Sequence, residues 1–100
     1  MLRKQVMEII ISHKDPLERR IIRIVSRHTA VPRKRISSED LLTEQLGLTS
    51  MDRITIISEI EFLYRITFGE YWDELVNAKT VSQLVSVTKK AMEKENSTEK

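Results

Sequence analysis

Cysteine is absent from this chain of 100 residues, and its absence excludes several kinds of chemistry. The chain can form no disulfide, offers no thiolate to a zinc ion and has no cysteine nucleophile. Any thiol chemistry would therefore need a sulfur atom that a cofactor supplies. Glycine and proline are also scarce, at two residues each, and this scarcity favours helices because both residue types interrupt them.

Long apolar segments are absent as well. No stretch approaches the ~20 apolar residues that a membrane-spanning helix needs, and the apolar run at residues 9–11 is too short for a secretory signal. Hydrophobic residues make up 40% of the chain and charged residues 32%, a composition typical of a soluble globular domain. At this length a single domain is expected. We expect a cytoplasmic monomer with no membrane span.

Charge is almost balanced, at a net +2, but it is unevenly distributed. Residues 1–35 contain ten Lys or Arg against three Asp or Glu, and residues 36–100 contain seven against twelve. The front of the chain is basic and the remainder is acidic. A basic surface can attract nucleic acid or anionic lipid, but no aromatic side chains are interleaved with these basic residues to stack on bases.

The first predicted helix begins at Asp15 and Pro16, an N-cap followed by a proline at the first helical position. Apolar residues then recur every three or four positions, which predicts an amphipathic helix to about Thr29. Pro32 prevents its continuation. Residues 31–47 are expected to form a long loop attached to the core at intervals through Val31, Ile36, Leu41, Leu42 and Leu46.

The segment after Ser50 alternates like a strand and also repeats like a helix. Thr49 and Asp52 decide for a helix, because they form the [ST]-x-x-[DE] pattern of a capping box. The expected apolar stripe is Met51, Ile54, Ile57, Ile60 and Tyr64, and Gly69 is expected to end this region. Six apolar residues are candidate core or cavity positions: Met51, Ile54, Ile57, Leu75, Val81 and Val85.

Two further helical segments are expected. Residues 70–77 predict a short turn of helix, and Thr80 with Gln83 forms a second capping box before a last helix over residues 81–93. The expected fold is all-α, with an N-terminal extension or short helix at residues 1–15, one domain at 16–93 and a frayed tail at 94–100.

Residues 44–52, EQLGLTSMD, resemble the (E/D)-x-LG-x-DSLD segment that surrounds the modified serine of acyl carrier proteins. The resemblance continues through the apolar stripe of the following helix and ends at Lys79, Thr80 and Val81, similar to the Thr-Val that opens the family's last helix. It covers about residues 16–92, with a small insertion near Trp72. It implies a four-helix bundle of three main helices and a short third helix, with a long loop between the first and second helices.

The same resemblance implies a function. A phosphopantetheinyl transferase would attach 4′-phosphopantetheine to Ser50, and the terminal thiol would carry an acyl or aminoacyl group as a thioester. The chain would then be no enzyme but the partner of acyl-loading and acyl-transferring enzymes in lipid or secondary-metabolite biosynthesis. The residues themselves favour this chemistry, because a serine at a helix start is accessible and a phosphodiester there gains typically 0.3–1 kcal/mol from the helix dipole.

The chain departs from the family pattern in two ways. Thr49 stands where the family has an aspartate, so a cap is retained but a carboxylate that helps to recruit metal and transferase is lost. Arg53, Thr55 and Arg65 dilute the acidic character of the second helix. Charge differences of this kind often determine partner specificity, which favours a specialised carrier with dedicated partners. Partner contacts are expected at Thr49, Met51, Asp52, Arg53 and Glu59.

Other interpretations also fit these residues. Ser50 can be an ordinary first-turn serine and Asp52 only a capping residue. The competing hypothesis is an unmodified helical interaction domain of the same fold with a basic partner-binding or nucleic-acid-binding arm. His13 and His28 have no partner at ligand spacing, so we expect no metal site. No Ser-His-Asp or paired-carboxylate pattern is present, so we expect no catalytic residues.

Overall fold

The structure is a computed structural model that describes residues 16–98. Its α-helices are α2 (Pro16–Ser26), α3 (Ser50–Tyr64), α4 (Trp72–Val76) and α5 (Val81–Thr98), and its 3-10 turns are η1 (Arg33–Arg35) and η2 (Gly69–Tyr71). Over residues 16–98 there is no strand, only an isolated β-bridge between Leu41 and Thr80. The prediction of an all-α fold is confirmed. The predicted extension at residues 1–15 lies outside the described residues.

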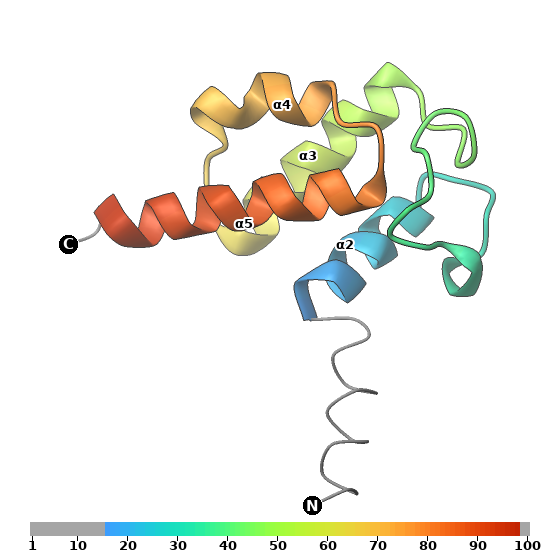
Figure 1. The fold of residues 1–100 in the computed structure, drawn as a ribbon, viewed down its shortest axis with the longest axis horizontal. Coiled ribbons are helices and arrows are strands. Elements are labelled where there is room, and N and C mark those ends of the chain that lie inside the picture. The colour runs from blue at the N-terminus through green and yellow to red at the C-terminus, as the bar shows by residue number, and fades with distance from the viewer. Residues whose placement is uncertain (1–15, 99–100) are drawn as a thin grey trace, which may run out of the picture.

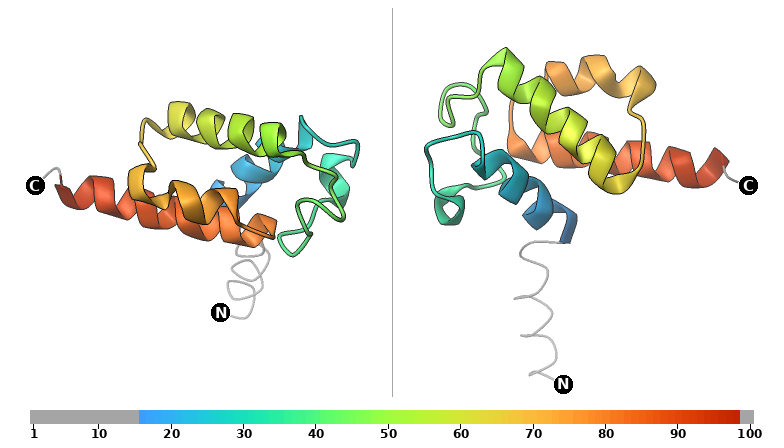
Figure 2. Two further views of the ribbon diagram at one scale, coloured as in Figure 1. Left: turned by 90° about the horizontal axis from the view of Figure 1, so that it is seen from above. Right: turned by 180° about the vertical axis from the view of Figure 1, so that it is seen from behind.

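Helix α2 packs against both α3 and α5, and α4 contacts the same two helices from the opposite side (Figure 1). The chain turns sharply after α4, so that α4 and α5 run antiparallel (Figure 1). The long connection from α2 to α3 covers one end of the helices, as the views from above and behind show (Figure 2). This connection leads into Ser50, the first residue of α3.

The core contains side chains from the helices and also from the long loop. Ile21, Val25, Ile57 and Ile60 are fully buried, and their burial supplies the main favourable term in folding. Four loop residues are buried with them: Ile36, Leu42, Leu46 and Leu48. The predicted attachment of the loop at intervals is therefore confirmed at Ile36, Leu42 and Leu46, while Val31 and Leu41 are only partly buried.

Helix α2 spans Pro16–Ser26, so it ends at Ser26 and not near Thr29 as predicted. Asp15, the predicted N-cap, lies outside the described residues. The amide of His28 donates to the carbonyl of Val25, three residues back, at 2.9 Å. This is the bond of a 3-10 turn, which commonly tightens the end of an α-helix. The tightening turns the chain out of the helix, so that His28 lies outside α2.

Helix α3 ends at Tyr64, before Gly69. Arg65 adopts the left-handed conformation, with φ of 56°, and its amide donates to the carbonyl of Glu61. A left-handed residue is a common helix C-terminus, although glycine usually occupies it. The sequence has no glycine there, which is why the pattern predicted a later end.

Helix α5 continues to Thr98 and does not end at residue 93. Residues 93–98 contain no glycine or proline to stop it. Contacts with the segment before α4 also hold it: Lys94 Nζ lies 2.9 Å from a carboxylate oxygen of Glu70, and the hydroxyl of Thr67 donates to Glu95 at 3.1 Å. The predicted frayed tail is therefore helical as far as residue 98, and residues 99–100 lie outside the described residues.

The buried face of α3 differs from the predicted stripe. Ile57 and Ile60 are buried and Tyr64 packs partly against the core, but Met51 and Ile54 are exposed. Ile56 takes a core position in their place, since α3 carries apolar residues on more than one side. Of the six candidate core positions, Ile57, Leu75, Val81 and Val85 are buried as predicted, and Met51 and Ile54 are corrected to surface positions.

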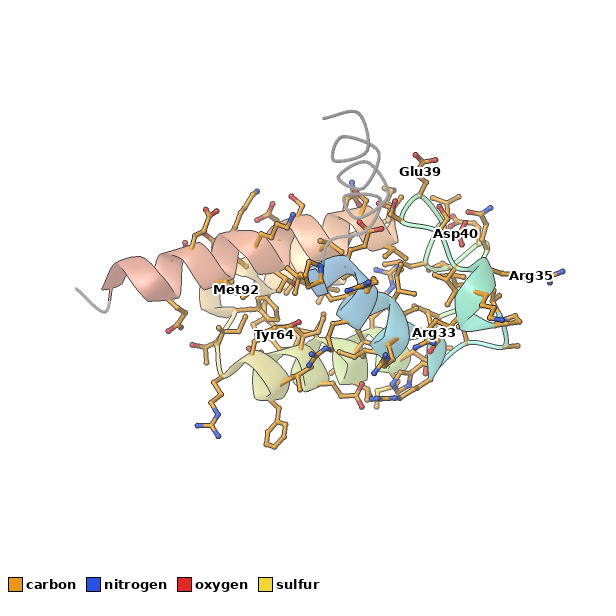
Figure 3. The ribbon with its side chains drawn as sticks, turned by 90° about the horizontal axis from the view of Figure 1, so that it is seen from below. Arg33, Arg35, Glu39, Asp40, Tyr64 and Met92 are labelled. Carbon is orange, nitrogen blue, oxygen red and sulfur yellow. The ribbon has the colours of Figure 1, made fainter. Side chains whose placement is uncertain are left out.

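Exposed basic side chains gather on two neighbouring elements. They belong to α2, to the residue directly after it and to η1, and α2 and η1 contact each other. These side chains are Arg19, Arg20, Arg23, Arg27, Arg33, Lys34 and Arg35. Arg35 extends outward from η1 at one end of the molecule, whereas Tyr64 and Met92 lie toward the other end (Figure 3). The basic front of the sequence is thus a basic region of the surface.

Candidate functional site

The loop before α3 is fixed to other parts of the chain. The amide of Leu42 donates to the carbonyl of Lys79, just before α5, at 2.9 Å, and the amide of Leu48 donates to the carbonyl of Leu42 at 2.9 Å. The hydroxyl of Thr29 donates to the carbonyl of Leu46 at 2.6 Å. These bonds connect the loop to the ends of α2 and α5, so the position at which α3 begins is fixed.

Gly47 allows the chain to reverse before α3. Its φ is +70°, in the left-handed region that side chains with a Cβ avoid, and its amide donates to the carbonyl of Thr43 at 3.0 Å. The reversal returns Leu48 to the core, where it is buried. The turn therefore explains why the EQLGLTSMD segment contains a glycine, and this explanation does not depend on any chemistry at Ser50.

The predicted capping box at Thr49 and Asp52 is confirmed. The amide of Asp52 donates to the hydroxyl oxygen of Thr49 at 3.1 Å, and the amide of Thr49 donates to the Asp52 carboxylate at 2.9 Å. Hydrogen bonding to Thr49, chiefly from its amide, lowers the pKa of Asp52 because it stabilises the ionised form. A threonine N-cap typically contributes about 1 kcal/mol to the stability of the helix.

Ser50 is the first residue of α3 and is exposed. The first-turn amides of a helix lack an acceptor within the helix, and the partial positive charge at this end favours anions. A phosphate on the Ser50 oxygen would therefore lie next to the favourable pole of α3. The arrangement allows an anionic group to be attached there without displacing any core side chain.

Arg53 has a structural function that the sequence did not reveal. Its Nη1 donates to the carbonyls of Val76 and Ala78 at 3.0 and 2.6 Å, and its Nη2 donates to the hydroxyl of Thr43 at 3.1 Å. The guanidinium thus connects the first turn of α3 to the end of α4 and to the loop. The predicted partner contact at Arg53 would have to compete with these bonds.

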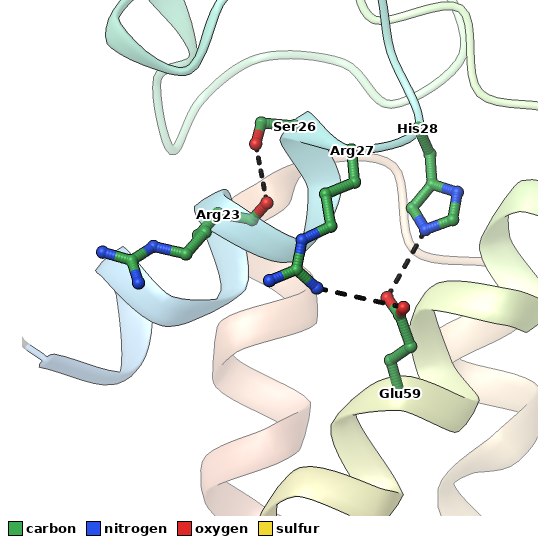
Figure 4. Close-up of polar contacts among 5 residues, drawn as sticks. All are labelled: Arg23, Ser26, Arg27, His28 and Glu59. Carbon is green, nitrogen blue, oxygen red and sulfur yellow. Dashed lines mark hydrogen bonds and ion pairs between the residues drawn. The ribbon is translucent and has the colours of Figure 1, made fainter.

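The acidic side chains of α3 also have partners within the protein. Glu59 Oε1 lies 3.4 Å from Nε2 of His28, and Glu59 Oε2 lies 4.0 Å from Nη1 of Arg27 (Figure 4). Glu61 accepts a hydrogen bond from the amide of Phe68 at 2.8 Å. Together with the capping role of Asp52, these contacts leave α3 without a row of uncommitted carboxylates.

Met51 and Ile54 lie on the surface near Ser50. Met51 is 69% exposed and Ile54 is 42% exposed, and both belong to the first half of α3. They stand three residues apart, so they share a face of the helix. The structure thus brings Thr49, Ser50, Met51 and Asp52 together at the start of α3, while Glu59 lies more than two turns further along.

Several further observations bear on the kind of site. Within residues 16–98 there is no group of three or more His, Asp or Glu residues that could hold a metal ion. Over the same residues, no helix has both the length and the apolar character needed to cross a bilayer. Comparison of the chain with protein-family models and with curated proteins gives no match.

Proposed function

We propose that this chain is a carrier protein similar to the acyl carrier proteins, with 4′-phosphopantetheine attached to Ser50. The observation that carries the proposal is the exposed Ser50 at the first position of α3, after a capping threonine and a fixed loop. The order of elements supports it, because three main helices and a short α4, with a long loop before α3, match the expected bundle.

The chemistry of the site supports the same proposal. Transfer of phosphopantetheine from coenzyme A forms a bond between phosphorus and the Ser50 oxygen, breaks the pyrophosphate bond and releases the adenosine bisphosphate and the hydroxyl proton. The product is an anionic phosphodiester beside the first-turn amides of α3, which favour it. Because the chain has no cysteine, the terminal thiol of the arm would be the sulfur that carries an acyl or aminoacyl group.

Partners of the carrier would include a phosphopantetheinyl transferase and the enzymes that load and transfer the acyl group. Thr49, Met51 and Ile54 are exposed around Ser50 and are available for such contacts. The carboxylate that the family has before its serine is missing, since Thr49 occupies that position. We therefore propose dedicated partners that recognise the apolar and hydroxyl groups around Ser50.

Intact-mass measurement tests the proposal directly. The full chain is incubated with a broad-specificity transferase, coenzyme A and Mg²⁺, and we expect the mass to increase by one phosphopantetheinyl group. Ser50→Ala should show no increase. Ser58→Ala is the matched control, because Ser58 is an exposed serine on the same helix but in its interior, and it should be modified like the wild type.

A wild-type chain that gains no mass, under conditions in which a known carrier is fully converted, would contradict the proposal. Modification that persists in Ser50→Ala would contradict the assignment of the residue. Arg20 and Arg23 of α2 form no ion pair within residues 16–98, which favours a second candidate, an unmodified interaction domain. Failure of the modification would favour that candidate.

A further inference from the structure

A groove between α2 and α3 has no part in the proposed modification of Ser50. Its volume is about 440 Å³. Helix α2 contributes Arg20, Arg23 and Ile24, and Arg27 follows directly after α2. Helix α3 contributes Phe62 and Leu63 among others. The groove therefore combines an apolar surface with three guanidinium groups, all of them on the α2 side.

The apolar part of the groove is unusually exposed. Phe62 is 86% exposed and Leu63 is 42% exposed, while Ile24, which also lines the groove, is buried. Burial of an aromatic side chain away from water is favourable, and aromatic residues are common anchors of protein interfaces. Phe62 contributes little to the packed core in this position, so covering it by a partner would be favourable.

The basic part of the groove is almost uncompensated. Within residues 16–98 no ion pair forms at Arg20 or Arg23, and Arg27 has only Glu59 at 4.0 Å. Glu59 also faces His28, toward which it is directed in Figure 4, while the Arg23 guanidinium points away from Glu59. Arginine favours carboxylates because its planar group can form two parallel hydrogen bonds with them.

We propose that this groove binds an acidic amphipathic helix of a partner protein, whose apolar residues cover Phe62 and Leu63 and whose carboxylates face the α2 arginines. A groove between two helices suits a third helix with anchors three and four residues apart. The proposal goes beyond the carrier function and is independent of it, because no contact in the groove involves Ser50.

Other occupants fit the groove less well. A duplex nucleic acid would pair with the arginines, but it would leave the apolar side uncovered because its backbone offers only phosphates. A bilayer surface favours a helix whose apolar face projects from a basic rim, whereas here the arginines stand on one side of a concave surface. A second copy would have to offer α4 as its acidic helix, but the Leu75 side chain of α4 is buried.

A peptide pair provides the test. The acidic probe is a labelled synthetic helix of about 18 residues, or about five turns, with leucine at three- and four-residue spacing and glutamate beside the leucines. The second probe has lysine in place of every glutamate. Fluorescence anisotropy with the full, unmodified chain should show binding of the acidic probe, which weakens as salt rises, and at least about tenfold weaker binding of the lysine probe.

Two substitutions locate the binding. Phe62→Ser and Arg23→Glu should each weaken binding of the acidic probe by about tenfold or more. The matched controls are Val76→Ser and Lys79→Glu, which remove an exposed apolar side chain and reverse an exposed charge outside the groove; both should bind like the wild type. Since all four side chains are on the surface, circular dichroism should show wild-type helix content in each.

Several results would overturn the proposal. These are no binding at about 1 mM acidic probe, equal binding of both probes, or Phe62→Ser and Arg23→Glu variants that bind normally. Tighter binding to phosphatidylglycerol vesicles or to duplex DNA than to the acidic probe would also overturn it in favour of those surfaces. As a second measurement, amide chemical shifts should change on α2 and α3 when the acidic probe binds. None of these results depends on whether Ser50 accepts phosphopantetheine.

Discussion

The Asp52 carboxylate makes the first turn of α3 sensitive to acid. Its pKa in the folded protein lies below the ordinary value of 3.8, mainly because the amide of Thr49 donates to it. Between the folded and unfolded pKa values the unfolded state binds more protons, so the free energy of unfolding rises with pH there. We expect this contribution to be present above pH 3.8 and lost as the pH falls through the folded pKa. Urea unfolding at a series of acid pH values measures it.

The variant that isolates this effect is Asp52→Asn. Its side-chain oxygen can still accept the Thr49 hydrogen bond but cannot ionise, so its free energy of unfolding should change less with acid pH than that of the wild type. Glu39→Gln removes one exposed negative charge elsewhere and controls for net charge. Identical pH profiles for Asp52→Asn and the wild type would show that Asp52 does not carry the effect.

At the residue scale, the sequence predicts contacts that are local and misses those that are not. The Thr49 and Asp52 box was predictable because both partners lie within one helical turn, where the spacing alone sets the geometry. The bonds of Arg53 to the end of α4 cross more than twenty positions of the chain, and the contact of His28 with Glu59 is more distant still. No periodicity signals such pairs, so the sequence pattern predicts only a partner contact at Arg53.

At the element scale, the end of α3 stores backbone strain that can be removed. Arg65 has φ of 56°, and a residue with a Cβ is less stable in that conformation by roughly 1–2 kcal/mol. Glycine would remove the strain, although its freer unfolded chain offsets about 0.4–1 kcal/mol of the gain. We expect Arg65→Gly to raise the free energy of unfolding by about 0.5–1 kcal/mol, as measured by urea denaturation.

Arg65→Ala distinguishes the backbone from the side chain in this prediction. Alanine keeps the Cβ, so the strain remains and no comparable gain is expected. If alanine stabilised the protein as much as glycine does, loss of the arginine side chain would be the cause and the strain argument would be wrong.

Helix starts were easier to predict than helix ends. Thr49 and Thr80 mark starts that the structure confirms, because capping uses side chains next to the helix. The ends do not follow the usual stop signals: α3 stops at a left-handed arginine where glycine is usual, and the contact of Lys94 with Glu70 supports the last turns of α5. Such ends carry no distinct residue pattern.

At the scale of the whole molecule, the all-α class was predictable and the orientation of α3 was not. The scarcity of helix-breaking residues and the apolar spacing of three or four residues were enough to predict the all-α class. Helix α3 has apolar side chains on more than one face and packs against α2 and α4, and the face that includes Ile56, Ile57 and Ile60 is the buried one. The exposed Phe62 beside the α2 arginines follows from that choice, which is why the groove could not be inferred from α3 alone.

The long loop should unfold together with the helices, because Leu42 is a fully buried member of the common core. Its amide also bonds to the carbonyl of Lys79. We expect Leu42→Ala to lower the free energy of unfolding by about 2–5 kcal/mol, as for a leucine in a helical core, a large part of the roughly 5–15 kcal/mol that stabilises a domain. Leu41→Ala, at a partly buried neighbour, should lower it much less. Urea denaturation followed by circular dichroism measures both, and equal losses below about 1 kcal/mol would show that the loop folds separately from the bundle.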